Sequence, residues 1–419
     1  VEERIPVKIN LPQMPLITVK VPDDINFKKD KKATLIAPEG FDTVGGGKRP
    51  HVTLDWYPRV AAKSSSGVRS TRHDTDLDEC TLASQHLAFM DYRVIYAAIQ
   101  QLKAERNWYN LNLSREAIQA TLEDTSWYTL YVPKERMAFD KFDRVFEWQE
   151  IAIALLKKYC DRFYKHEQNA YEAPFRKYAE LDPSDPNFFE EYKLMIDQSE
   201  KLILQRIGEL KEHIKNGTLT DFNIGGKGDA LFFDKHLYSP LLHLKDGVDN
   251  DLLKITPTHL NKGENDFIHD LRDYYQSSPS LLDGKEIYLL RNQSRGKGVG
   301  FFEAGNFYPD FILWVLEGEN QKIVFVDPKG ILRCEGINDP KLKFYETVKE
   351  LELKMREDKV PFAEKVEMHS FIVSNTPLSK VRWWTEDLND IEDFAARNVL
   401  FQYEDRDCYI EKIFSEVLA

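Results

Sequence analysis

The chain has 419 residues, 42% of them apolar and 12% aromatic, and its formal net charge is -13. This composition excludes a disordered, collagenous or low-complexity protein, and the length suits two or three domains of ~100 to 200 residues each. The negative charge disfavours a protein that coats nucleic acid through its overall charge, but it is compatible with a local basic site.

The sequence also predicts where the protein resides. No segment approaches the ~20 consecutive apolar residues of a membrane span. The N-terminal "VEERIPVKINLP" lacks the charged and apolar segments of a signal peptide. Four widely separated cysteines form no metal-binding spacing, which indicates free thiols in a reducing compartment and argues against zinc. We therefore expect a cytoplasmic protein without membrane contact, and the initial Val1 suggests a fragment or a processed chain.

Residues 1–80 are expected to form a β-containing linker region. Three short runs, "PLITVKVP", "ATLIAPEG" and "HVTLDWYPRV", have the composition of strands and are separated by charged or glycine- and proline-rich turns. The stretch Ala61–Glu79 is polar and aperiodic, which is typical of an exposed loop. "TLIAPEGFDTVGGGKRP" is not a P-loop, because Asp42 stands where the first glycine belongs and Arg49 follows Lys48.

Residues 81–217 are expected to form a long helical spacer. Apolar residues at helical spacing predict a helix in "YRVIYAAIQQLKAERNW", and Ser114 is a plausible N-cap for the next helix, "REAIQATLED". After a predicted strand in "SWYTLYVP", a long helix is expected over about Phe142–Tyr171. A second long helix is predicted over Asp185–Asn216, capped by its first residue and ended by a glycine, so that the two helices form an αα-hairpin.

Residues 218–419 alternate predicted strands and helices. A hairpin is expected in "TDFNIGGKGDALFF", a helix in "ENDFIHDLRDYYQSS" and a strand in "KEIYLLRNQS"; a strand pair, a helix over about Pro340–Glu357 and the strand "EMHSFIVSN" follow. The fold class is therefore α/β (α+β overall). A mixed sheet flanked by helices is expected here, preceded by the β-containing segment and the helical spacer.

The strand pair in "PDFILWVLEGENQKIVFVDPK" carries candidate site residues. Asp310 opens the first strand and Asp327 ends the second, so a turn at "EGEN" returns the two acids to one end of the sheet. Residues i and i+2 of a strand share a face, which aims Lys329 the same way as Asp327. Two carboxylates suit Mg²⁺ or Mn²⁺, and a lysine stabilises charge on a phosphate. The alternative for "DPK" is a plain surface turn.

"PD", sixteen residues and then "DPK" is the signature of the PD-(D/E)xK nucleases. Together with "LYSPLLHL", "GENDFIHDLRDYY" and "EIYLLRNQSRGKGVGFFEAGNFYPDFILWV", it resembles the C-terminal endonuclease region of type III restriction enzyme Res subunits and related restriction-like helicases, over about Leu237–Ser374. The resemblance implies a restriction-endonuclease-like core. It also implies that Asp310 and Asp327 bind the metal, that Lys329 is catalytic and that Glu264 is an additional catalytic acid and metal ligand. For Glu264, a favourable charge at a helix N-terminus is the alternative.

The resemblance further implies a bacterial protein that acts on double-stranded DNA with a modification (methyltransferase) subunit and an upstream helicase motor. This chain lacks motor motifs, so ATP would act only through that motor. Basic residues before the first acid are candidate DNA contacts or a solvated loop, and Lys343 is a further candidate; the tandem tryptophans are candidates for base stacking or core packing. The basic residues are Arg291, Arg295 and Lys297, and the tryptophans are Trp383 and Trp384.

We therefore expect a Mg²⁺-dependent DNA endonuclease module of restriction type. Two alternatives remain open from the sequence: a catalytically silent module that docks DNA or a subunit, and an autonomous nuclease without a motor.

Overall fold

The computed structural model describes residues 1–22, 24–39, 51–57, 61–64, 67–70, 78–185, 187–249, 252–277, 282–293, 308–331, 334, 339, 341–381 and 390–419. The protein is mixed α/β and contains helices, several small sheets and one larger mixed sheet. Its contacts group the chain into two compact units, Val1–Lys20 with Arg176–Ala419, and Val21–Phe175. This grouping differs from the three regions expected from the sequence, because the first twenty residues pair with strands far along the chain.

The unit Val21–Phe175 is built around one long helix, α6 (Asp143–Glu172), as predicted. Buried residues recur every fourth position along it and form a stripe that packs with α4 (Tyr92–Glu105) and α5 (Arg115–Glu123). The Ser114 hydroxyl accepts a hydrogen bond of 3.0 Å from the Ala117 N–H, which confirms the predicted N-cap. The other elements are α1 (Phe27–Asp30), β4 (Ala33–Thr34), β5 (Val52–Asp55), β6 (Ala61–Ser64), β7 (Gly67–Ser70), β8 (Glu79–Cys80), α3 (Ser84–Leu87), β9 (Leu111–Asn112), β10 (Tyr128–Tyr131), η1 (Lys134–Arg136) and η2 (Ala173–Phe175).

Within the described residues, the other unit contains four small sheets in addition to its main one. β1 (Glu2–Pro6), β12 (Glu191–Ile196) and β17 (Leu253–Thr256) form one three-stranded sheet, in which β12 is central. Helix α7 (Lys201–Asn216) buries an apolar stripe in the same core. The remaining small sheets are β13 (Phe222–Ile224), β14 (Gly228–Leu231) and β16 (Leu241–Leu244); β2 (Lys8–Ile9) with β15 (Tyr238–Ser239); and β3 (Ile17–Lys20) with β11 (Lys177–Glu180).

The helix predicted over Asp185–Asn216 is wrong in its first half. Tyr192, Leu194 and Ile196 are buried in alternation with more exposed neighbours, as in a strand, and Met195 is exposed. The local spacing of apolar residues allowed a helix. The segment forms a strand because it pairs with β1 on one side and with β17 on the other. The predicted αα-hairpin is also wrong, since β11 and β12 separate α6 from α7.

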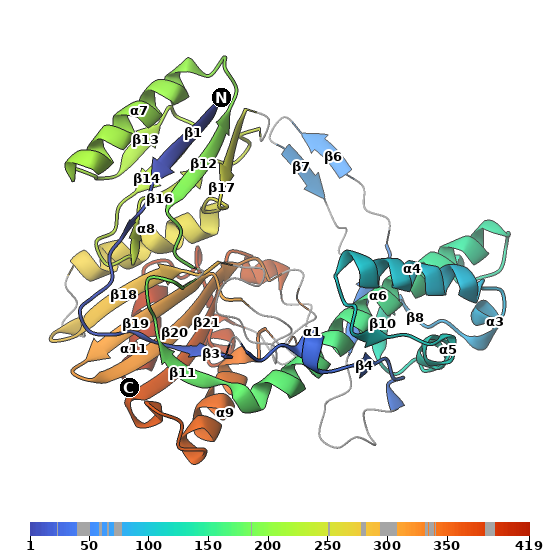
Figure 1. Ribbon diagram of the computed structural model, residues 1–419. Helices are drawn as coiled ribbons and strands as arrows, with labels where there is room; N and C mark the ends of the chain where they lie inside the picture. The colour runs from blue at the N-terminus through green and yellow to red at the C-terminus, as the bar shows by residue number, and fades with distance from the viewer. Residues whose placement is uncertain are drawn as a thin grey trace. The chain divides into compact units, whose positions relative to one another are not determined.

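The main sheet has five strands in the order β18-β19-β20-β21-β22, seen in orange to red in Figure 1. Its first three strands are antiparallel and its last three are parallel. The predicted strand pair forms its centre, with the turn at Glu317–Asn320 as expected. The strands are β18 (Glu286–Arg291), β19 (Phe311–Glu317), β20 (Asn320–Lys329), β21 (Val366–Ser374) and β22 (Val399–Phe401).

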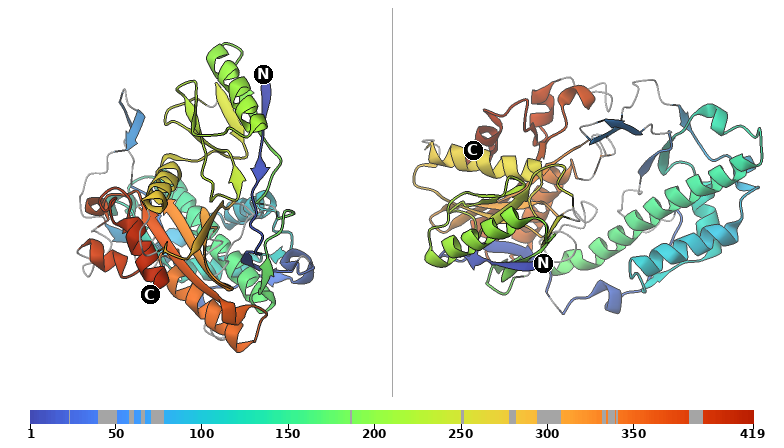
Figure 2. Two further views of the ribbon diagram at one scale, coloured as in Figure 1. Left: turned by 90° about the vertical axis from the view of Figure 1, so that its left-hand side faces the viewer. Right: turned by 90° about the horizontal axis from the view of Figure 1, so that it is seen from above.

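Helices α8 (Lys262–Gln276) and α9 (Phe344–Glu357) cover opposite faces of this sheet, as Figures 1 and 2 show. Phe267 of α8 packs on Phe311, and Phe344 of α9 packs on Phe325, with ring centroids 5.1 Å and 6.0 Å apart. Phe311 pairs with Val326, the neighbour of Phe325, so the two contacts lie on opposite faces. The shorter helices are η4 (Ala363–Lys365), η5 (Leu378–Lys380), α10 (Ile391–Ala395) and α11 (Tyr409–Leu418).

The N-terminal residues are tied to the main sheet by buried polar side chains. The indole N–H of Trp314 donates to the Ile17 carbonyl at 2.7 Å. The Gln321 side chain accepts from the Ile17 N–H at 2.8 Å and donates to the Pro15 carbonyl at 2.7 Å. Because these groups are buried, the bonds fix the start of the chain to the strands that carry the predicted acids.

Candidate functional site

Asp310 and Asp327 lie at the same end of the main sheet. The β19–β20 ladder ends at the pair Phe311–Val326, so the next pair in the same register is Asp310 with Asp327. Side chains directly opposite each other in an antiparallel pair are neighbours on one face. Asp327 is buried within β20, whereas Asp310 precedes β19 and is partly exposed. The hairpin therefore brings the two predicted acids together.

Lys329 contacts Asp327 directly, since its ammonium Nζ donates to Asp327 Oδ2. The two residues are separated by Pro328 and share a strand face, as predicted from the alternation. Burial, together with the nearby charge of Lys341, lowers the pKa of Lys329 to about 8, and the charge of Asp310 opposes this change. The lysine thus lies within the field of both acids.

Glu264 is buried in the first turn of α8, where it completes a capping box. Its Oε2 accepts from the Asn261 N–H at 2.9 Å, and the Asn261 side chain accepts from the Glu264 N–H at 3.0 Å. Burial raises the pKa of Glu264; the charge of Arg291 opposes the rise and that of Asp310 adds to it. The charge of Asp310 therefore acts on Glu264, while the capping box alone accounts for an acid at this position.

Two glycines, one in α8 and one at the end of β20, both lie close to the side chain of Asn375. A Cβ at Gly263 would lie 3.0 Å from Asn375 Nδ2, and one at Gly330 would lie 3.1 Å from Asn375 Oδ1. The Asn375 N–H in turn donates to the Lys329 carbonyl at 3.1 Å. Glu264 and Lys329 each adjoin one of these glycines, so the shared contact with Asn375 positions the helical acid beside the hairpin.

The carboxyl of Asp310 has no hydrogen bond from any residue that the structure describes, although its main-chain carbonyl accepts from the Asn292 N–H at 2.8 Å. Burial raises its pKa, and the charges of Lys329, Arg291 and Lys341 oppose this rise. Within the described residues, three cations therefore act on the charge of this carboxylate without a hydrogen bond to it.

Arg291 ends β18 and is engaged within the protein. Its guanidinium Nη2 lies 3.0 Å from Glu264 Oε2 and donates to the His259 carbonyl at 3.0 Å, and Nη1 donates to the Thr258 carbonyl. Its main-chain N–H donates to His236 Nε2 at 2.9 Å. The sequence suggested a DNA contact here; the structure directs this side chain toward Glu264.

Two residues that the sequence did not single out adjoin the site. The tripeptide Asp-Pro-Lys occurs a second time in the sequence. Of its residues, Lys341 lowers the pKa of Lys329 and Asp339 raises it. Asp339 is buried and its Oδ1 accepts from the Lys341 N–H at 2.9 Å, just before α9. The repeated tripeptide was a signal available in the sequence. Only its first copy lies in a strand opposite another acid.

The remaining predicted contacts are only partly placed. Lys343 is the residue before α9 and is partly buried, and its role as a DNA contact stays a prediction. Arg295 and Lys297 lie outside the described residues, as do Trp383 and Trp384 and the glycine-rich segment around Lys48. Their predicted roles therefore also stay predictions.

The side chains of the site fit a hard divalent cation by their chemistry. Carboxylate oxygens are the ligands that Mg²⁺ prefers, and this ion is commonly held by one or two carboxylates together with water and substrate phosphate. Asp310 and Asp327 supply two such groups. Among the described residues no three His, Cys, Asp or Glu side chains lie close enough to hold an ion by themselves.

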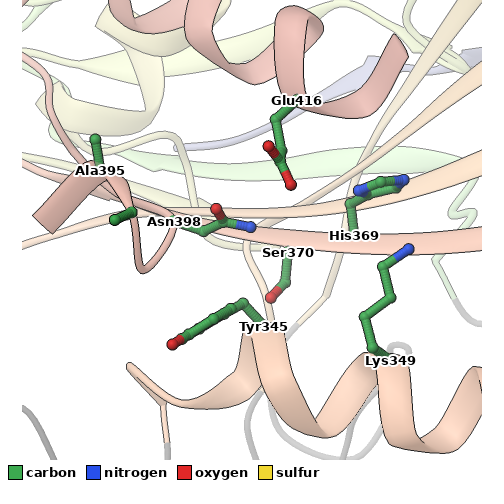
Figure 3. A pocket seen from close by; sticks show the side chains of 8 residues that line it. Tyr345, Lys349, His369, Ser370, Ala395, Asn398 and Glu416 are labelled. Carbon is green, nitrogen blue, oxygen red and sulfur yellow. The ribbon is translucent and has the colours of Figure 1, made fainter. Parts of the chain in front are cut away.

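A separate cavity of about 180 Å³ lies at the edge of β21 and does not include these acids (Figure 3). It is lined by polar side chains of α9, β21 and α11, among them Lys349, His369 and Glu416. Burial lowers the pKa of His369 to about 4, so the ring is neutral at pH 7. The cavity has room for several water molecules.

No protein-family model, curated protein or solved structure matches this chain. No helix within the described ranges is long and apolar enough to cross a membrane. The four cysteines, all among the described residues, form no disulfide bond with one another, in agreement with the expected thiols.

Proposed function

We propose that this chain is a Mg²⁺-dependent DNA endonuclease module of restriction type, built on a restriction-endonuclease-like core. The observation that carries the proposal is the convergence of Asp310, Asp327 and Lys329 at one end of a mixed sheet, with Glu264 brought beside them by α8. The sequence resemblance to type III restriction enzyme Res subunits adds the substrate class, double-stranded DNA.

Each residue has a distinct part in this proposal. Asp310 and Asp327 would hold the cation, which would relieve their mutual repulsion. The chemistry supplied by Mg²⁺ at this place would be polarisation of a phosphoryl oxygen and activation of a water molecule at neutral pH. Lys329 releases Asp327 and orients the attacking water or stabilises the negative charge that develops on the phosphate. Lys341 adds a further positive charge that acts on Lys329 and Asp310 and would favour a bound phosphate.

The partners and setting of the module are part of the same proposal. We place it in the bacterial cytoplasm, beside a modification subunit that recognises the site and an ATP-dependent motor that precedes the module in the intact enzyme. The acidic net charge of this chain fits that arrangement, because sequence recognition and tracking on DNA would then be the work of other parts.

Cleavage of supercoiled plasmid DNA tests the proposal. The wild-type chain should nick or linearise the plasmid with Mg²⁺ or Mn²⁺ and not with EDTA, and Asp327→Ala and Lys329→Ala should each reduce the rate by about 10² or more. Glu319→Ala is the matched control, because it removes an exposed acid from the turn at the other end of the same strand pair. Equal nicking by wild type and both site variants would reject the proposal.

A catalytically silent docking module is the second candidate. The direct contact of Lys329 with Asp327 favours it, because the lysine occupies an oxygen that a cation needs. Under this alternative Mn²⁺ does not bind at the acids, while DNA or a subunit still binds to the chain. Calorimetric titration with Mn²⁺ separates the two: binding lost in Asp310→Asn supports the nuclease, and no binding supports the docking module.

A further inference from the structure

Resting on the proposed function, we infer that Arg291 and Asn292 are positioning residues that set the separation of Glu264 and Asp310. They are the last residue of β18 and the one after it, and each is bonded to one of the two acid-bearing segments. This assignment replaces a direct contact of Arg291 with DNA.

Arg291 holds the helical acid in place. Its guanidinium fork bonds Glu264 Oε2 at 3.0 Å and the consecutive carbonyls of Thr258 and His259, which lie just before α8. The guanidinium is rigid and planar, so three acceptors fix both the side chain and the entry to the helix. Glu264 is therefore bound from its own cap on one side and from the sheet on the other.

His236 fixes the backbone from which Arg291 extends. Its Nε2 accepts the Arg291 N–H at 2.9 Å, and its Nδ1 lies 2.7 Å from the Tyr238 carbonyl, so the neutral ring carries its proton on Nδ1. Burial lowers the pKa of His236 to about 3, which keeps this arrangement intact at neutral pH. The backbone of Arg291 is thus fixed by His236, which is itself bonded to Tyr238.

Asn292 holds the other acid-bearing segment. Its side-chain amide donates to the Pro309 carbonyl at 2.8 Å, and its main-chain N–H donates to the Asp310 carbonyl at 2.8 Å. Both bonds are made to the backbone that leads into β19, so they fix the direction of Asp310 without touching its carboxyl. Two adjacent residues of one strand end therefore connect the two acids.

Neither residue touches the reacting atoms in this account, so the effect of changing them should appear first in metal affinity. Loss of groups that orient a metal ligand typically weakens metal binding about 10- to 100-fold. Arg291→Lys retains the charge but not the fork, and Asn292→Ala removes one bond to Pro309. We expect each variant to raise the Kd for Mn²⁺ about tenfold in calorimetric titration of the full chain.

The matched control is Arg272→Lys in α8, the helix that carries Glu264. Arg272 makes a bidentate ion pair with Asp221, with both distances 2.8 Å, and is not part of the site. It should reduce the melting temperature about as much as Arg291→Lys and leave the Kd for Mn²⁺ unchanged. The double variant Arg291→Met with Glu264→Gln removes both charges together, so that no single buried charge is left unpaired and able to unfold the protein. The Kd of this double variant for Mn²⁺ should equal that of Glu264→Gln alone.

The outcomes separate this inference from the proposed function. If wild type binds Mn²⁺ and cuts plasmid, and Arg291→Lys and Asn292→Ala keep the wild-type Kd, the positioning role is wrong and the proposed function stands. If wild type neither binds Mn²⁺ nor cuts, both are wrong. An increase of the Kd in both variants and not in Arg272→Lys supports the inference.

Discussion

Replacing Asp310 by asparagine should stabilise the protein while removing its response to metal. The carboxyl of Asp310 has no hydrogen bond among the described residues, and burial raises its pKa, so the ionised form works against folding at pH 7. Asparagine has the same shape and no charge. We expect the unit that carries the site to gain on the order of 1 kcal/mol in free energy of unfolding when EDTA is present.

The metal response should change in the opposite direction. At a tenfold excess of Mg²⁺ over its Kd, mass action stabilises wild type by about 1.4 kcal/mol, or roughly 3 to 5 °C in melting temperature. Asp310→Asn should lose this shift and its cleavage activity together. Differential scanning calorimetry with Mg²⁺ and with EDTA measures both effects, and Asp234→Asn, an exposed acid of the same unit, is the control. An Asp310→Asn variant that melts below wild type in EDTA, or that still responds to Mg²⁺, would refute this reasoning.

Three further changes probe other parts of the account. Lys341→Met should raise the pKa of Lys329 and weaken DNA binding. The association constant, measured by fluorescence anisotropy, should then depend less steeply on salt concentration. An unchanged salt dependence would mean that Lys341 does not contact a DNA phosphate. Burial lowers the pKa of His236 to about 3, whereas the pKa is ~6.5 in the unfolded chain, so the free energy of unfolding decreases as the pH falls below 6.5, by about 2 kcal/mol at pH 5. Urea unfolding at pH 7 and at pH 5 should show a smaller decrease in His236→Gln than in wild type. Equal decreases would contradict this role of His236. Trp314→Phe leaves the Ile17 carbonyl without its donor and should cost about 1 to 3 kcal/mol in urea unfolding, whereas no loss would mean that residues 15–17 are not anchored to the main sheet.

The strand pair was predictable because its signals are local. A turn at Glu317–Asn320 between two apolar runs defines an antiparallel pair, and alternation alone then aligns Lys329 with Asp327. The caps of α5 and α8 follow the same logic, since Ser114 and Asn261 each bond within their own first turn. Such features depend on residues a few positions apart and are visible in the sequence.

The contacts that complete the site are long-range and were not predictable. Glu264 reaches the hairpin because Gly263 and Gly330 both pack on Asn375, which lies at the end of a third strand. Arg291 is directed inward because acceptors in another segment meet its guanidinium, whereas its sequence context of basic and glycine residues suggested an exposed position. The failure of the helix predicted over Asp185–Asn216 has the same cause, since strand pairing with β1 overrides local spacing.

The most direct test of the central claim is to locate a bound cation. Crystals of the full chain soaked in Mn²⁺ should show an anomalous peak within about 2.5 Å of carboxylate oxygens of both Asp310 and Asp327, with the Lys329 ammonium moved off Asp327. A peak that lies elsewhere, or no peak while Lys329 stays bonded to Asp327, would contradict the account.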